Sequence, residues 1–142
     1  MPLFLIASIA GQGVVFDADQ VDSVVDIGEI VAVPRAEPSV RGLTALRSRV
    51  VTVVDTRLAL GLGPMPPHVR RAVISRQDGH YYAMLVDALE DIEMFETSPM
   101  PHIPPTQGRW SRAANGMVVR DGEPLLVLDL TRLVPNATPQ AA

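Results

Sequence analysis

The chain has 142 residues, an apolar share of 47% and a formal net charge of −4, which is typical of one folded domain and excludes a disordered chain. Its 12 basic residues are all arginine and are outnumbered by 16 acidic residues, so a general nucleic-acid-binding surface is not expected, because such surfaces need concentrated positive charge. Cysteine is absent from the sequence, which excludes disulfides and thiolate metal sites.

The first third of the chain predicts short strands. Apolar runs over residues 3–9 and 13–16 flank a Gly-Gln-Gly turn, a spacing that favours a hairpin. Segment 17–27 starts with apolar residues three apart among acidic ones, which predicts a helical turn that runs into a strand. Residues 30–33 predict a further strand that ends at the prolines that follow. No stretch approaches the ~20 apolar residues of a membrane helix, so we expect a soluble, cytoplasmic protein.

Residues 42–55 and 116–129 repeat one pattern. In each, a glycine opens an apolar run, a polar turn interrupts it, and a second apolar run ends on aspartate 13 residues after the glycine. The turns fall at residues 47–48 and 121–122, and two-residue hairpin turns of this kind need positive φ at both positions. Self-similarity along a chain is a signal about the whole fold. The duplicated hairpin therefore predicts a pseudo-symmetric β protein.

Short helical turns are predicted directly after both hairpins, over residues 56–62 and 131–134. Asp55 and Asp129 precede them, and aspartate suits the capping of free N–H groups at the start of a helix. Capping therefore accounts for both carboxylates without any chemistry.

The second copy begins with apolar runs over residues 69–75 and 80–86, which predict two more strands. Four prolines in segment 98–108 predict an irregular loop, and the residues from Pro135 onward predict a frayed tail. With about ten short strands and few helices, the sequence favours an all-β pair of barrels or a sandwich.

Asp55 and Asp129 are the strongest candidates for catalysis, because aspartic proteases bring together two carboxylates from two related lobes. The protease loop, however, requires glycine where this chain has Arg57, and the second copy reads Asp-Leu-Thr. The three histidines are scattered, and no serine lies in a Gly-x-Ser-x-Gly frame. We therefore expect no enzyme activity, no cofactor and no metal site.

The first hairpin carries three arginines on an otherwise acidic protein. Arg41, Arg47 and Arg49 surround the apolar Leu43 and Leu46, whereas the second hairpin carries acidic residues at the matching turn. A solvated turn explains any one of these arginines. The difference between the copies favours a surface that docks a partner, because arginine presents a planar fork to carboxylates and carbonyls.

Residues 40–57 closely resemble the signature of the CheW-like domain, and residues 85–92 and 125–133 resemble the second half of that family's pattern. The resemblance covers about residues 3–134. It implies an all-β fold with two SH3-like, five-stranded barrels around a shared core, with short helical turns, in a single domain that spans residues 1–142 and ends in a tail from 135. It also implies a stand-alone adaptor, not the histidine kinase CheA that carries a similar domain.

The resemblance further implies an adaptor that links the cytoplasmic tips of chemoreceptors to the regulatory domain of a CheA-type kinase, in arrays on the inner face of the membrane and without inserting into it. Ala45 and Ser48 depart from the asparagine and glycine of the family pattern. The matching positions, together with the arginine hairpin, give the predicted protein-binding residues Val21, Gly42, Leu43, Leu46, Arg47 and Arg49.

Three alternatives remain open at this point. The alternatives to the adaptor described above are a paralogue that serves a non-flagellar chemosensory system, a pseudo-symmetric aspartic hydrolase that uses Asp55 and Asp129, and a regulatory barrel pair that binds its own kind.

Overall fold

The computed structural model describes residues 2–98 and 110–135 of the chain. Most of the predicted loop over 98–108 and nearly all of the predicted tail lie outside these residues. The first repeat contains β1 (Leu3–Ile9), β2 (Gln12–Asp17), η1 (Ala18–Gln20), β3 (Ser23–Asp26), β4 (Val40–Leu46), β5 (Arg49–Val54) and α1 (Thr56–Ala59). The second contains β6 (Arg71–Gln77), β7 (His80–Leu85), β8 (Ala88–Met94), α2 (Trp110–Ala113), β9 (Ala114–Arg120), β10 (Glu123–Leu128) and η2 (Leu130–Arg132).

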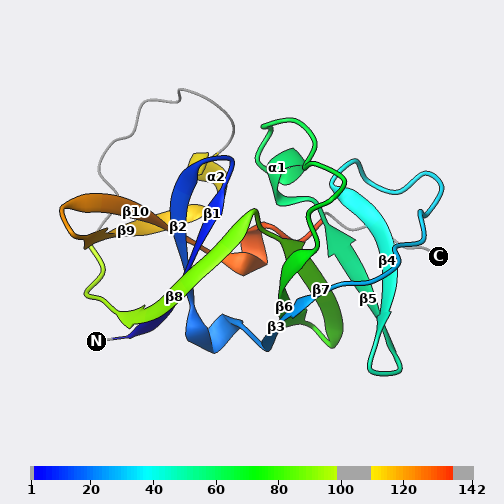
Figure 1. Ribbon diagram of the computed structural model, residues 1–142, viewed down its shortest axis with the longest axis horizontal. Coiled ribbons are helices and arrows are strands. Elements are labelled where there is room, and N and C mark those ends of the chain that lie inside the picture. Colours follow the sequence, from blue (N-terminus) through cyan, green and yellow to red (C-terminus); the bar gives the residue numbers. More distant parts are fainter. Residues whose placement is uncertain (1, 99–109, 136–142) are drawn as a thin grey trace.

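The strands form two five-stranded sheets that lie side by side as two lobes (Figure 1). One has the order β8-β1-β2-β10-β9 and is called barrel A below, and the other has the order β3-β6-β7-β5-β4 and is called barrel B. None of the described helices is long and apolar enough to cross a membrane. The prediction of an all-β fold with two five-stranded barrels and short helical turns is confirmed.

Each barrel is built from both sequence repeats. Barrel A takes β1 and β2 from the first repeat and the last three strands from the second, and barrel B takes the remaining strands in the mirrored way. The parallel contacts match as well: Leu126 lies opposite Val14 in barrel A, and Thr52 lies opposite Tyr82 at the equivalent place in barrel B. The two repeats are therefore interleaved around a pseudo-twofold axis, and neither repeat contains a complete sheet.

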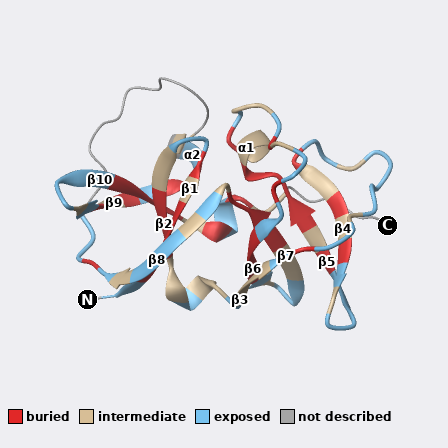
Figure 2. Cartoon of the chain, viewed as in Figure 1, coloured by how far each residue is buried: buried red, intermediate tan, exposed pale blue. Residues whose placement is uncertain are grey.

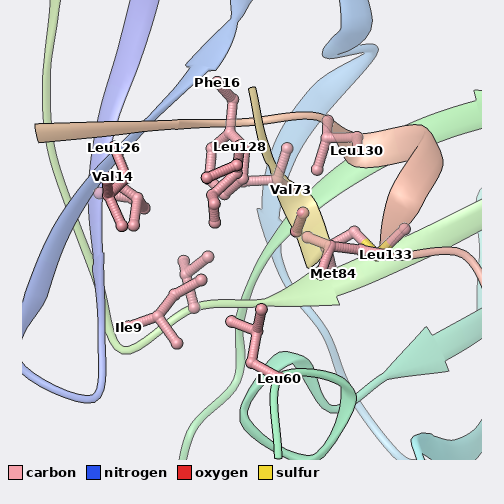
Figure 3. Packing of buried hydrophobic residues seen from close by; sticks show 14 of the residues in the cluster. Ile9, Val14, Phe16, Leu60, Val73, Met84, Leu126, Leu128, Leu130 and Leu133 are labelled. Carbon is pink, nitrogen blue, oxygen red and sulfur yellow. The ribbon is translucent and has the colours of Figure 1, made fainter. Parts of the chain in front are cut away.

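Three apolar clusters fill the interior of the protein, one shared by the two barrels and one inside each barrel. The largest lies between them and takes side chains from both sheets, such as Phe16 and Leu128 from barrel A and Val73 and Met84 from barrel B (Figure 3). A smaller cluster fills the inside of each barrel. Figure 2 shows the buried residues concentrated where the two lobes meet.

The central strands are buried on both faces, which explains their unbroken apolar runs. Val53 faces the inside of barrel B and its neighbour Val54 faces the shared core. Val127 and Leu128 alternate in the same way in barrel A. Because successive side chains of a strand point to opposite faces, a strand covered on both sides reads as continuously hydrophobic.

The predicted turns and caps are confirmed. The Asp55 carboxylate accepts a hydrogen bond from the Leu58 N–H at 3.0 Å at the start of α1, and Asp129 accepts one from the Thr131 N–H at 3.0 Å at the start of η2. Both hairpin turns have positive φ at their two central residues, with φ of 52° at Arg47 and 68° at Ser48 in the first.

The strand predicted over residues 30–33 is not formed. This segment crosses the outer edge of β4 and makes a single bridge, in which the N–H groups of Val31 and Leu43 each donate to the other's carbonyl at 2.8 Å. Pro34 then offers no N–H for a further bond, and Arg35 turns the chain away with a φ of 62°.

The crossing depends on Gly42, which has a φ of 151°. A Cβ at this position would collide with the carbonyl oxygen of Val31 and would lie 2.8 Å from its carbonyl carbon. We expect Gly42→Ala to lower the free energy of unfolding by about 2 kcal/mol or more, because it adds a backbone collision to an unfavourable φ. Urea denaturation measures this loss.

The matched control for this substitution is Gly79→Ala. Gly79 also has a positive φ, 81°, but a Cβ there meets nothing within 4 Å. Equal losses in the two variants would contradict the collision at Gly42.

The interleaving also predicts how fragments behave. Because β1 and β2 bond to strands of the second repeat, the separate fragments 1–66 and 67–142 should stay unfolded at micromolar concentration. Mixed together, they should assemble into a folded complex. Circular dichroism and amide NMR spectra of each fragment and of the mixture test this. A first fragment that folds alone as a monomer would contradict a single folding unit.

Candidate protein-docking surfaces

The six residues predicted to bind a partner fall in three different places. Val21 packs against the shared core. Gly42 is buried beneath the crossing segment, and Leu43 lines a groove on the outer face of the β4–β5 hairpin. The remaining three, Leu46, Arg47 and Arg49, lie together at the open end of barrel B.

That open end, called the basic mouth below, surrounds a cavity of about 290 Å³. The guanidinium carbon of Arg49 lies 4.2 Å from the centre of the Tyr81 ring, and that of Arg76 lies 5.7 Å from it. Such stacking fixes a guanidinium while its N–H groups stay free to bind. The cavity is lined by Asp22, Ser23, Leu46, Arg47, Arg49, Ile74 and Tyr81.

The strand pattern places these side chains at the mouth. Arg49 lies two and four residues before Val51 and Val53, whose side chains fill the inside of barrel B. Since alternate residues of a strand share a face, Arg49 continues this inward-facing column to the end of the barrel. The charged groups are thus the last layer of an otherwise apolar interior.

The equivalent end of barrel A, called the acidic mouth below, has the opposite character. It surrounds a wider cavity of about 460 Å³ that includes Glu90, Asp121 and Glu123 in its lining. Arg120 in β9 reaches the strand β8, 2.8 Å from Glu93 and 3.3 Å from Glu90. Desolvation lowers the pKa of Arg120, but Glu93, Glu90 and Asp121 outweigh it, so its pKa is raised above the ordinary value.

The repeat relates the two mouths position by position. In barrel A, Arg120 joins the edge strands β8 and β9 by ion pairs. At the equivalent position of barrel B, Leu46 packs against the interior cluster. The equivalent positions, barrel A first, are Arg120 and Leu46, Glu123 and Arg49, Asp121 and Arg47, and Gly13 and Tyr81.

Sequence reasoning missed an exposed apolar patch on barrel A. Leu3, Ile92 and Met94 are 44%, 55% and 63% exposed, and Leu3 lies opposite Met94 in the pairing of β1 with β8. At the equivalent positions of barrel B, Arg71 and Asp26 form an ion pair at 2.9 Å. The sequence held a signal for this patch: at two equivalent positions of the repeats, the apolar Leu3 and Met94 replace the charged Arg71 and Asp26.

A second apolar patch lies on barrel B and was also missed in part. Val31 and Val50 are 62% and 67% exposed, and with Leu43 and Ala45 they line a groove of about 430 Å³. The predicted strand over residues 30–33 concealed this patch, because a paired strand would have covered the edge of β4. Isolated exposed apolar residues are ordinary, but groups of them mark interaction surfaces.

The structure does not bring the two aspartates together. Asp55 is buried, and its two carboxylate oxygens accept the backbone N–H groups of Leu58 and Met65 at 3.0 and 2.8 Å. Asp129 lines a cavity of about 500 Å³ whose lining does not include Asp55. The paired carboxylates of an aspartic hydrolase are therefore not formed.

Asp129 itself serves a structural role. Partial burial raises its pKa, but hydrogen bonds from the side chain of Gln20 and from Thr131 outweigh this effect and hold the pKa below its ordinary value. Its charge thus stabilises the cap of η2. Within residues 2–98 and 110–135, no group of three or more His, Asp or Glu side chains is placed to hold a metal ion.

The turn at the tip of the basic mouth holds two residues in an unfavourable backbone conformation. Arg47 and Ser48 both have positive φ, which costs most side-chain types about 1 kcal/mol or more. Asn-Gly is the pair that such turns favour. We expect the double substitution Arg47→Asn with Ser48→Gly to raise the free energy of unfolding by about 1 kcal/mol, measured by urea denaturation.

The reverse exchange in the second hairpin is the control for this prediction. Asp121→Arg with Gly122→Ser should lower stability by a similar amount, since this turn also has positive φ at both positions, 51° and 81°. No gain in the first hairpin would mean that its turn is not strained.

Comparisons with known proteins agree with this fold. Residues 3–138 match the model of the CheW-like domain family. A relative from Thermotoga maritima named "Chemotaxis protein CheW" is 22% identical over 127 residues, covering 89% of this chain and 83% of that protein. Another from Rhizobium meliloti with the same name is 28% identical over 111 residues, covering 77% of this chain and 72% of that protein.

A solved structure shares the architecture. The crystal structure of the scaffolding protein TtCheW from Thermoanaerobacter tengcongensis superimposes with a TM-score of 0.78 at 20% identity, covering 90% of this chain and 89% of that one. At this level of identity the likeness concerns the fold. Since the family match extends over almost the whole chain, the protein belongs to the CheW-like domain family.

Proposed function

We propose that this protein is a chemotaxis adaptor that couples the cytoplasmic tips of chemoreceptors to the regulatory domain of a CheA-type histidine kinase at receptor arrays. The family and the names of the relatives support a scaffolding role in chemotaxis. A scaffold must hold two partners at once without performing a reaction on either.

The observation that carries the proposal is the presence of two separate apolar patches on different barrels. One consists of Leu3, Ile92 and Met94 on barrel A, and the other includes Val31 and Val50 on barrel B. Two patches on one rigid body allow two partners to bind without competing. Weak contacts of this kind gain strength when many copies assemble.

The patch on barrel A fits a receptor helix. Leu3 and Leu5 lie on the same face of β1, and Leu5 belongs to the shared core, so the patch is the exposed margin of the surface between the barrels. A helix can lay its apolar stripe against such a margin. We assign the groove on barrel B, which adjoins the basic mouth, to the kinase.

The experiment is to measure binding of a receptor cytoplasmic fragment and of a CheA-type regulatory domain to the purified protein. Met94→Asp should weaken receptor binding at least tenfold and leave kinase binding within twofold. Val50→Asp should do the opposite. Both residues are solvent-exposed, so the fold should survive, and circular dichroism checks this.

Val119→Asp is the matched control. Val119 is 54% exposed on β9 but belongs to neither patch, so this change should affect neither partner. Binding of neither fragment to the wild type would overturn the proposal. If the protein instead binds only itself, it is the self-associating barrel pair. If it binds a receptor and a kinase from a non-flagellar system, the adaptor role holds for that system.

A further inference from the structure

The basic mouth holds positive charge that the described part of the chain does not neutralise. Among residues 2–98 and 110–135, ion pairs are formed by Arg57, Arg71, Arg120 and Arg132. Arg47, Arg49 and Arg76 form none there, although all three are exposed near one cavity. Their single acidic neighbour in the lining of that cavity is Asp22.

In the acidic mouth, by contrast, the arginine is neutralised by carboxylates of the same chain. There Arg120 lies within 4 Å of three carboxylates, those of Glu90, Asp91 and Glu93. The equivalent positions in barrel B are Asp22, Ser23 and Val25, so two of the three carboxylates have no counterpart. Of the two mouths, the basic mouth is thus the one whose arginines have few carboxylates of this chain beside them.

From this imbalance we propose that the basic mouth binds a carboxylate side chain of an acidic segment of a protein partner. The inference rests on the proposed function in taking the partner to be a protein, and it adds the chemistry of the segment that docks. The acid inserts between Arg47 and Arg49.

The cavity has the features that a glutamate side chain requires. Its lining combines the guanidinium groups of Arg47 and Arg49 with the apolar Leu46 and Ile74, which suit the methylene groups of the side chain. Arg49 is already fixed by its stacking on Tyr81, so little conformational freedom is lost when it binds. At about 290 Å³ the cavity accepts side chains but no folded element.

The turn geometry is consistent with a binding role for Arg47. It keeps an arginine at a position with φ of 52°, where the second hairpin has an aspartate. Unfavourable backbone conformations persist mainly where function maintains them. Because the whole chain carries a net charge of −4, an acidic segment is repelled elsewhere and steered to this mouth.

The test is a titration of the isotope-labelled protein with the peptide acetyl-Gly-Glu-Glu-Gly-amide, followed through the arginine side-chain N–H signals in NMR spectra. We expect saturable shifts at Arg47 and Arg49, with a dissociation constant in the millimolar range. The matching peptide with glutamine in place of glutamate should give no saturable shift. Saturable binding of the glutamine peptide with equal affinity would overturn the proposal.

Variants of single arginines separate binding from folding. Arg47→Asn relieves the turn while it removes the charge, so it should weaken peptide binding at least fivefold without loss of stability. Arg49→Gln should weaken it similarly. Arg70→Gln is the control, because Arg70 is exposed just before the other end of β6 and lines neither mouth. An equal loss in all three variants would indicate only general charge attraction and would overturn the proposal.

Inorganic phosphate is the third probe. Binding of phosphate more tightly than the peptide would make the mouth a site for small anions and would overturn the assignment to a protein segment. The outcome is independent of the adaptor role: a protein that binds receptor and kinase but ignores the peptide refutes this inference alone. A protein that binds the peptide and neither partner refutes the proposed function alone.

Discussion

The shared apolar core between the two barrels is the constraint on which the rest of the structure depends. Because the central strands bury both faces, each of their side chains lies in one of the three apolar clusters and cannot change without disturbing the packing there. The protein's variable chemistry is therefore confined to the ends of the barrels and to the outer margins of the sheets. The basic mouth, the acidic mouth and both apolar patches all lie in these places.

Pseudo-symmetry makes these surfaces comparable within one molecule. The same position carries Arg120 in the acidic mouth and Leu46 in the basic mouth. Likewise, the ion pair of Arg71 with Asp26 in barrel B is at the position of the exposed apolar pair of Leu3 with Met94 in barrel A. A symmetric scaffold thus presents asymmetric surfaces. Such a difference is what an adaptor needs to tell two partners apart, since specificity is a difference between affinities.

The duplicated hairpin, the caps at Asp55 and Asp129 and the positive-φ turn at Arg47 were predictable, because each rests on residues close together in sequence. The interleaving of the repeats was not, since strand order depends on contacts between residues far apart. The strand predicted near Val31 failed because one bridge satisfies its backbone and Pro34 prevents more. The arginines of the first hairpin could be identified from the sequence. The stacking of Arg49 on Tyr81 could not, because the two residues are far apart in the chain and only the fold brings them together.

The interleaving of the repeats has a consequence for how such a chain evolves after a gene duplication. Since every barrel contains strands from both halves, neither half can drift toward a separate domain, and both are inherited as one unit. The two halves can then differ mainly at solvent-facing positions, where substitutions leave the shared core intact and change which partners bind.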